Sequence, residues 1–400
     1  MTQEFRVLIV TNAYSPRIGG ISAYLENLVR GLEGRGIRTS VSAMPESFNR
    51  LDEAAKGHAI WWRTIHLLFV AAFVIKSVGS IIGLRLEGSS LIVHSHSASY
   101  CLVVGLVAKL LGSTAVHTFH SPLEKPSAVL QTFAARCDAL VFVSQALFEL
   151  YAAFGIWNSN TFLIPGGVDT ERFRPPSQHE RQLARISIGE YFDGSQVKGE
   201  VILFVGRVTK EKGVDYLLEA SEDVFRTLPE ARLLVIGPYS TNPEGRAFLV
   251  RCMELAGRGF LTGRVAMPGE ITERALLSCY WGADLLVCPS TWEEPASIVV
   301  AEGSACGLPV VASHVGGLAE RIDHDVTGLL VPAKDPQGLA GGILGVLSNR
   351  PRAEAMGRNG RLKASRELSM DRTTDFHVNL YTSLLTNAVE NEGIAGEKSR

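Results

Sequence analysis

The chain has 400 residues and a mass of 43.3 kDa, a length that suits two domains of comparable size better than one core. Its 39 Lys and Arg against 41 Asp and Glu give a net charge of −2, which argues against nucleic acid as the main partner, because phosphate-binding surfaces need a basic excess. The apolar fraction of 46% excludes a disordered chain. Six scattered cysteines without a C-x-x-C pair predict neither a disulfide framework nor a zinc site.

The first half of the chain alternates short apolar runs with helical patterns, which is typical of β-α-β units. The sequence enters a strand pattern at once, without the layout of a signal peptide, so we expect a cytoplasmic protein. Helices are expected over 20–33 and 99–111. Strands are expected at 6–11, 91–94, 115–119, 139–143 and 161–164. We therefore predict an N-terminal Rossmann-like domain over residues 1–170.

The longest apolar stretch, residues 59–84, contains nine uninterrupted apolar residues from Leu67 to Ile75. Spanning a bilayer takes about 20 predominantly apolar residues, so we favour a helix packed on the sheet over a transmembrane segment. The alternative is a helix lying in a membrane interface with Trp61 and Trp62 as anchors. Peripheral contact with the inner face of a membrane therefore stays open.

Residues 171–199 are charged and rich in Pro, Gly and Asp, and we interpret them as a linker. A second alternating series follows, which predicts a C-terminal Rossmann-like domain over 200–369. Its strands are expected at 200–205, 231–236, 284–288, 309–312 and 329–331, and its helices near 213–227, 271–281, 297–306 and 335–348. The tail is helical in pattern from 351 to 387, and its end, about 370–388, could pack back on the N-terminal domain. The fold class is α/β, with two Rossmann-like domains facing across a cleft.

Two turns that join a strand to a helix are candidates for phosphate binding. Gly19 and Gly20 precede the first helix, where glycine lets the backbone approach a ligand and the helix N-terminus offers free N–H groups. The motif is not G-x-G-x-x-G, so a dinucleotide oxidoreductase is disfavoured, and a purely structural role for the glycines is equally consistent. In the second domain Arg207 and Lys212 flank a turn before a helix and suit a pyrophosphate clamp, although two solvated surface cations would give the same pattern.

The paired carboxylates Glu294 and Glu302 are the strongest local signal. A strand ends near Pro289, a polar loop carries Glu294, and Ser297 is a plausible N-cap for a helix that bears Glu302. Glu302 on an otherwise apolar helix needs a partner, and vicinal hydroxyls of a ribose would supply one. Backbone N–H groups of the first helical turn would face a phosphate or a sugar, at Ala296, Ser297, Ile298 and Val299. Chance spacing of two carboxylates is the alternative.

Several motifs in order resemble the retaining GT-B glycosyltransferases of family 4 (glycosyl transferases group 1). The E-x7-E motif at Glu294 and Glu302 is followed by ACGLPVVAS, GG…E and TGLLV, and preceded by SPRIGGISAYLENL, PGGVDTERFRP and GRVTKEKGVDYLLEA. The resemblance covers nearly the whole chain. Gly166 stands where the family usually has Asn in N-G-V-D, and glycine can still form that turn.

The resemblance implies a transferase that moves a sugar from a nucleotide-diphosphate sugar to an acceptor hydroxyl, with retention. In that family Arg207 and Lys212 would hold the diphosphate and stabilise the leaving group. Glu302 would bind the ribose and Glu294 the transferred sugar. Gly19 and Gly20 would face the diphosphate, and His120, at the end of a strand, would lie near the sugar and the acceptor. Weaker acceptor-side candidates are His94, His96 and Ser144.

The resemblance implies no cofactor beyond the donor substrate and no metal site. Asp323 and Asp325 have D-x-D spacing, but they lie in a short loop and read as a solvated turn. The acceptor would be a saccharide or a lipid-linked group, in glycan, polysaccharide or glycolipid synthesis. Two rival functions are a nucleotide-sugar 2-epimerase of the same architecture and a non-catalytic sugar-nucleotide-binding subunit.

Overall fold

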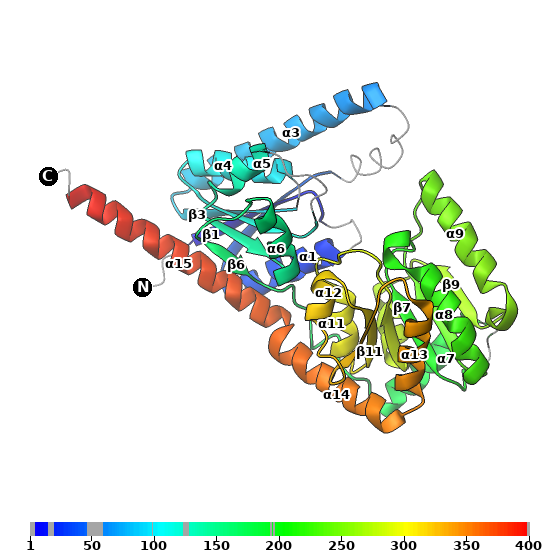
Figure 1. The fold of residues 1–400 in the computed structure, drawn as a ribbon. Coiled ribbons are helices and arrows are strands. Elements are labelled where there is room, and N and C mark those ends of the chain that lie inside the picture. The colour runs from blue at the N-terminus through cyan, green and yellow to red at the C-terminus, as the bar shows by residue number, and fades with distance from the viewer. Residues whose placement is uncertain are drawn as a thin grey trace. The chain divides into compact units, whose positions relative to one another are not determined.

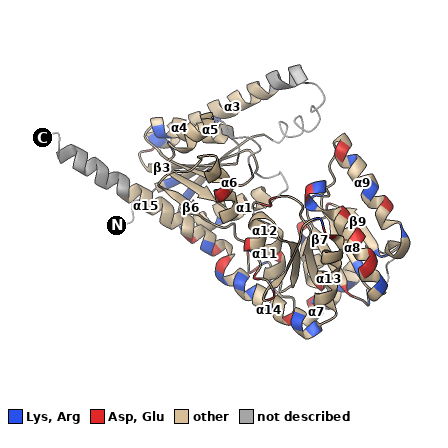
Figure 2. Cartoon of the chain, viewed as in Figure 1, with Lys and Arg blue, Asp and Glu red and all other residues tan. Residues whose placement is uncertain are grey.

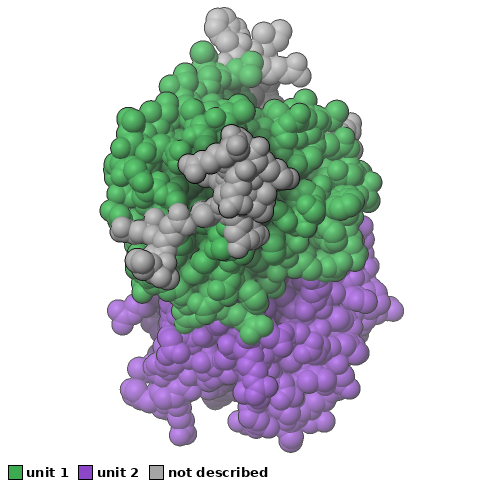
Figure 3. All heavy atoms as spheres, turned by 90° about the vertical axis from the view of Figure 1, so that its left-hand side faces the viewer, with its two compact units in different colours: residues 1–167, 370–400 green, residues 168–369 purple. Residues whose placement is uncertain are grey.

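The computed structural model describes residues 5–14, 20–45, 59–97, 99–122, 128–192, 194 and 197–397. The chain divides into two compact units, residues 1–167 with 370–400 and residues 168–369 (Figure 3). The two expected Rossmann-like domains correspond to these units. The chain of the first unit is interrupted, because its C-terminal segment returns to it after the second unit is complete.

In the described part of the first unit, six parallel strands form one sheet in the order β2-β1-β3-β4-β5-β6 (Figure 1). The strands are β1 (Phe5–Thr11), β2 (Arg38–Ala43), β3 (Ser90–His96), β4 (Thr114–Phe119), β5 (Ala139–Phe142) and β6 (Thr161–Leu163). The flanking helices are α1 (Gly20–Gly34), α3 (Ala59–Leu86), α4 (Ser99–Leu110), α5 (Ala128–Ala134), α6 (Gln145–Ala153) and α15 (Met370–Glu397). The sequence did not predict β2, because this edge strand, RTSVSA, is mostly half-exposed and lacks an apolar run.

Both faces of this sheet are covered, which explains why its strands read as continuous apolar runs. In β1, Val7 and Ile9 pack into a cluster with α1 and α15, whereas Leu8 and Val10 pack into a cluster with α3 and α4. Alternate residues of β1 thus pack into two hydrophobic clusters, one on each face of the sheet.

The tail forms two helices, α14 (Arg350–Glu367) and α15, where the sequence pattern suggested one helical stretch. The break at Leu368 and Ser369 lets α14 belong to the second unit and α15 to the first. On α15, Tyr381 is fully buried and Asp375 accepts a 2.7 Å bond from Arg35, the residue that follows α1.

The described residues of the second unit also form a six-stranded parallel sheet, in the order β12-β11-β10-β7-β8-β9. Its strands are β7 (Val201–Val205), β8 (Arg232–Ile236), β9 (Val265–Gly269), β10 (Leu285–Cys288), β11 (Val310–Ser313) and β12 (Gly328–Val331). Its α-helices, besides α14, are α7 (Gln178–Gly189), α8 (Val214–Thr227), α9 (Pro243–Ala256), α10 (Glu273–Gly282), α11 (Ile298–Ala305), α12 (Gly316–Glu320) and α13 (Pro336–Leu347).

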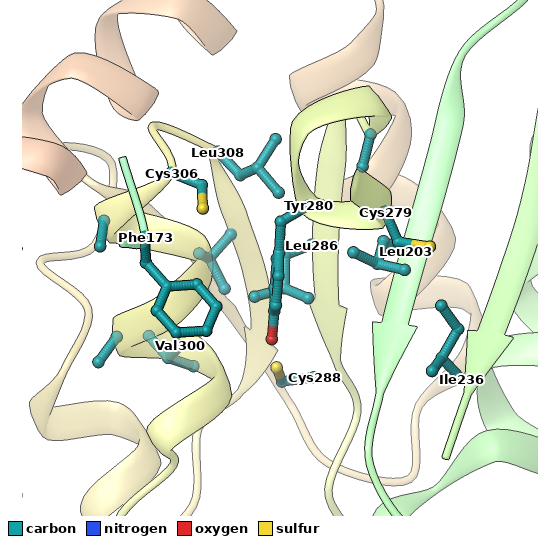
Figure 4. Packing of buried hydrophobic residues seen from close by; sticks show 14 of the residues in the cluster. Phe173, Leu203, Ile236, Cys279, Tyr280, Leu286, Cys288, Val300, Cys306 and Leu308 are labelled. Carbon is teal, nitrogen blue, oxygen red and sulfur yellow. The ribbon is translucent and has the colours of Figure 1, made fainter. Parts of the chain in front are cut away.

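Residues 171–199, expected to form a linker, belong to the second unit. A capping box of Ser177 and Glu180 starts α7, whose Arg181 and Arg185 both bind Asp284 at 2.6 and 2.8 Å. Ile188 of α7 is fully buried in the same hydrophobic cluster as Cys279 and Tyr280, which Figure 4 shows. The charges that suggested a solvated linker are instead paired within the fold.

Candidate functional site

Glu294 lies in the loop that leads from β10 to α11, where the residue is 6% exposed and its carboxylate is surrounded by donors. The Lys212 ammonium lies 2.8 Å from Oε1 and 2.7 Å from Oε2. Ser290 Oγ and Trp292 Nε1 also donate to Oε2, at 3.2 and 3.0 Å. Glu293, the preceding residue, is exposed. The structure therefore joins two predicted site residues, Lys212 and Glu294, in one ion pair.

The turn that carries Lys212 is fixed to the Glu294 loop by backbone contacts. The short helix Lys210–Lys212 ends at Gly213, whose φ of +68° favours glycine. A Cβ on Gly213 would lie 2.0 Å from the carbonyl oxygen of Pro289, so the two segments approach closely. The Thr291 N–H also donates to the Glu211 carbonyl at 2.8 Å. These backbone contacts hold Lys212 next to the Glu294 carboxylate.

The first turn of α12 supports the same loop from another direction. The Gly317 N–H donates a 2.7 Å bond to the Glu294 carbonyl. Gly316 has a φ of +46°, and a Cβ there would lie 2.6 Å from that carbonyl oxygen. The pair of glycines in the GG…E motif thus allows α12 to contact the backbone of Glu294 directly.

Glu302, on the mostly apolar helix α11, has the polar partner that we expected it to need. The hydroxyl of the fully buried Tyr280 donates to its Oε2 at 2.7 Å. Burial raises the pKa of Glu302 to about 7, against the lowering effects of the Tyr280 bond and the charge of Arg172. Its carboxyl group therefore titrates near neutrality. Figure 4 shows Tyr280 among the core residues, with Phe173 and Val300 close by. Glu302 itself stays partly exposed, so a hydroxyl group of a ligand could reach it.

The N-terminus of α11 follows directly after Glu294 and Ala296. Ser297 occupies the N-cap position, but its side chain makes no capping hydrogen bond. Ser297 is therefore the N-cap residue, as predicted, but its hydroxyl does not cap the helix. The first backbone N–H groups of α11 therefore receive no hydrogen bond from the Ser297 side chain. Ile298 and Val299 are half-buried.

Two arginines add positive charge to this region. Arg207, predicted to clamp a diphosphate with Lys212, is exposed and forms no ion pair with the residues described. Arg321, at the end of α12, is 5% exposed, and burial lowers its pKa to about 10 against the charges of Glu320 and Glu294. Lys212 and Arg321 thus act together on the Glu294 carboxylate, and a third cation, Arg207, remains open to a ligand.

Four of these side chains escaped the sequence analysis: Ser290, Trp292, Tyr280 and Arg321. Ser290 and Trp292 precede Glu294 by four and two residues, so a search for donors near a buried carboxylate could have found them. Tyr280 lies 22 residues before Glu302, and nothing in its own helix indicates that its hydroxyl reaches that residue.

In the first unit, His120 follows β4 and belongs to a cluster of buried imidazoles. Its Nε2 lies 3.0 Å from Nδ1 of His96, which is fully buried and whose Nε2 has no hydrogen-bond partner among the described residues. Tyr24 packs edge-on against the His120 ring at 5.1 Å. His96 therefore fixes the orientation of His120.

The other N-terminal candidates have structural partners or lie outside the described residues. His94 bonds to Tyr381 at 2.6 Å and to Thr118 at 2.7 Å, so both of its ring nitrogens are occupied. Ser144 caps α6 by accepting from the Leu147 N–H. Gly20 is the exposed first residue of α1, and Gly19 lies outside the described residues. His94 and Ser144 thus have structural roles, and their acceptor-side role stays a prediction.

The histidine cluster predicts that acid destabilises the first unit. Burial lowers the pKa of His94 and His96 well below 6.5, of His117 and His120 to about 3, and of His377 to about 4. Because the unfolded chain binds these protons first, stability is full above the unfolded pKa near 6.5 and falls as the pH drops toward the folded values. Each ring should cost about 1.4 kcal/mol per pH unit in that window.

Urea unfolding of the purified protein at pH 7.5 and at pH 5, monitored by its intrinsic fluorescence, would measure this loss. The variant His94→Gln removes one titrating ring and should show a smaller difference in unfolding free energy between the two pH values. Equal unfolding free energies of the natural protein at both pH values would contradict the prediction.

The aspartates with D-x-D spacing are tied to cations: Asp323 pairs with Lys363 and Asp325 with Arg352, and both aspartates are exposed. In the part of the chain that the structure describes, no group of three or more His, Cys, Asp or Glu residues could hold a metal ion.

The family models and curated relatives match both halves of the chain. Residues 192–363 match the model described as "Glycosyl transferases group 1" and residues 18–172 the model described as "Glycosyltransferase Family 4". D-inositol 3-phosphate glycosyltransferase of Segniliparus rotundus is 30% identical, over 89% of this chain and 83% of that protein. GDP-mannose-dependent alpha-(1-6)-phosphatidylinositol monomannoside mannosyltransferase of Mycobacterium tuberculosis is 28% identical, over 89% and 92%.

Solved structures share the fold. Anabaena HepE, crystallised in complex with UDP, superposes with a TM-score of 0.73 at 20% identity, over 94% of this chain and 100% of that chain. Sucrose-phosphate synthase of Thermosynechococcus elongatus gives 0.76 at 23% identity, over 96% and 100%. The two parallel sheets with flanking helices are the GT-B fold. The chain belongs to the family 4 (group 1) glycosyltransferases and is a glycosyltransferase.

Proposed function

We propose that the protein transfers a hexose from a nucleotide-diphosphate sugar to a hydroxyl group of a glycolipid acceptor, with retention at the anomeric carbon. The observation that carries the donor half of this proposal is the Lys212–Glu294 pair in the loop before α11, together with the buried Tyr280–Glu302 bond on that helix. The relatives that act on inositol phosphate and phosphatidylinositol mannoside support the acceptor half.

In this proposal the second unit holds the donor. The diphosphate lies against the first N–H groups of α11 and the cations Arg207 and Lys212, because a helix N-terminus and adjoining cations both favour negative charge. The ribose hydroxyls donate to Glu302 in its ionised form. A hydroxyl of the transferred sugar donates to Glu294 Oε1, which keeps acceptor capacity beside its bond to Lys212.

The chemical step proposed is a same-face substitution. The bond from the anomeric carbon to the donor phosphate breaks, the acceptor oxygen bonds to that carbon, and the acceptor proton passes to the departing phosphate oxygen. Lys212 has the largest role, since negative charge builds on the diphosphate as the bond breaks and a fixed ammonium there stabilises it. Arg207 adds a guanidinium that can bind two phosphate oxygens at once.

The test is an acceptor-dependent assay of the full chain. UDP-glucose, GDP-mannose and ADP-glucose are each incubated with inositol 3-phosphate or with phosphatidylinositol vesicles, and release of the nucleotide diphosphate is measured. We expect release with one donor only when an acceptor is present, and a product with the anomeric configuration of the donor by NMR.

Donor consumption at the same rate without acceptor would favour the 2-epimerase instead. Binding of a donor without any turnover across the acceptors would favour a non-catalytic subunit. A product of inverted configuration would overturn retention while leaving sugar transfer intact.

A further inference from the structure

The outward face of α3 is apolar, although this helix lies at the surface of its unit. Exposed positions recur every three or four residues along it, as on one side of a helix. Among them Leu67, Ile75 and Leu86 are 66, 72 and 83% exposed. The remaining exposed positions of α3 in the stretch 66–86 are Leu68, Ala71, Ala72, Lys76, Gly79, Ile82, Gly83 and Arg85. An outer helix of a soluble domain normally carries charged residues on this side.

The opposite side of α3 is part of the core. Phe73, Ser77 and Ile81 are at most 2% exposed, and Ser77 Oγ lies 2.8 Å from Ser42 Oγ on β2. By length and composition alone, the segment His66–Leu86 could cross a membrane. The share of its most apolar window that is buried within the structure is 17%. Crossing a bilayer would pull the buried side out of the unit and break that packing. A helix anchored on one side and apolar on the other can lie on a surface but not span it.

A further exposed apolar residue lies near the C-terminal end of α3. Arg85, near the end of α3, lies 3.1 Å from where a Cβ on Gly112 would be, so the ends of α3 and α4 adjoin. Leu110, the last residue of α4, is 86% exposed. We call the exposed apolar residues of α3 together with Leu110 the α3 patch.

The charges around the α3 patch are positive. Residues 59–86 contain no Asp or Glu, and Lys76 and Arg85 are both exposed; Figure 2 shows α3 without acidic colour. The next carboxylate, Glu87, is paired with Arg6. A second copy docked face to face would bring the same cations together without a carboxylate to pair with them. Anionic lipid headgroups supply that counter-charge, and acyl chains supply the apolar contact.

We propose that the α3 patch docks in the interface of an anionic lipid bilayer, with α3 parallel to the membrane plane. The leucines and isoleucines of the patch enter the boundary between headgroups and acyl chains, and Lys76 and Arg85 contact lipid phosphates. This inference does not depend on the identity of the donor or acceptor. It would bring the first unit to the surface where a lipid-linked acceptor lies.

The test is flotation of the purified full chain, without donor or acceptor, with two kinds of vesicle: phosphatidylcholine alone, and phosphatidylcholine with phosphatidylglycerol. We expect clearly stronger binding to the anionic vesicles, weakened by high salt. The triple variant Leu67→Ser, Ile75→Ser, Leu86→Ser should bind about 100-fold less, because three exposed side chains lose their transfer into lipid. The variant Lys76→Glu should lose the preference for anionic vesicles.

A matched control is Leu183→Ser with Leu362→Ser, two leucines of the second unit that are 51 and 52% exposed. This control should bind vesicles as the natural protein does. The substituted side chains in both variants are exposed, so thermal unfolding should be unchanged.

Three outcomes would overturn the proposal. The first is no binding to either vesicle. The second is a dimer in sedimentation velocity that the triple variant abolishes, while neither protein floats. The third is resistance to alkaline carbonate extraction, which would indicate a spanning helix. Because no turnover is measured, failure here is distinct from failure of the sugar-transfer assay.

Discussion

Replacing Lys212 with methionine is expected to lower the turnover of sugar transfer by about 100-fold or more. The ammonium lies against Glu294, in the loop that leads into α11, and in the proposed mechanism it stabilises the charge that develops on the donor diphosphate. Lys210→Met provides the matched control, because Lys210 is exposed and lies in the same short helix; its carbonyl, which accepts from Thr291, is unchanged. The measurement is kcat with saturating donor and acceptor.

Loss of a lysine that pairs with a buried carboxylate could also destabilise the fold, since Glu294 would keep an uncompensated charge. The double variant Lys212→Met, Glu294→Gln separates the two effects. It should regain thermal stability but not turnover. A Lys212→Met enzyme with full stability and nearly normal kcat would refute the role assigned to Lys212.

The affinity for the intact donor is expected to fall as the pH drops below about 7, by roughly tenfold per pH unit. Burial raises the pKa of Glu302 to about 7, and only its ionised form accepts hydrogen bonds from both ribose hydroxyls. Protonation therefore competes with the donor. The diphosphate of a sugar nucleotide does not titrate in this range, and burial holds the pKa of His120 at about 3, so neither contributes.

Calorimetric titration with the nucleotide sugar from pH 5.5 to 8 measures this dependence. The variant Glu302→Gln should bind about 10- to 100-fold more weakly at pH 8 and lose the pH dependence, because a charged hydrogen-bond acceptor is replaced by a neutral one. Glu293→Gln, which changes an exposed carboxylate nearby, should leave both unchanged. An affinity that is constant with pH, or that rises in acid, would contradict the assignment of Glu302.

Much of the fold follows from the sequence because its parallel strands are buried on both faces. Runs such as that around Leu8 and Ile9 are continuously apolar, and the helices between them carry clear periodicity. The strand β2 escaped prediction because an edge strand need not be apolar. The segment around α7 was misread because Arg181 and Arg185 look solvated until Asp284 is placed beside them.

The same distinction applies to the site. The positions of Glu294 and Glu302 on a loop and a helix could be predicted, because strand, turn and helix signals lie next to them in the chain. The Lys212–Glu294 pair joins residues 82 apart, and the Tyr280–Glu302 bond depends on how α10 packs against α11. Such pairs are set by tertiary packing, which no local pattern records.

The most direct test of the account is a crystal structure of the full chain with the nucleotide diphosphate of its preferred donor. The account predicts the two phosphates within hydrogen-bond distance of Arg207, Lys212 and the first N–H groups of α11, and the ribose hydroxyls on Glu302. A nucleotide bound elsewhere, with Lys212 still held only by Glu294 and Glu302 only by Tyr280, would contradict it.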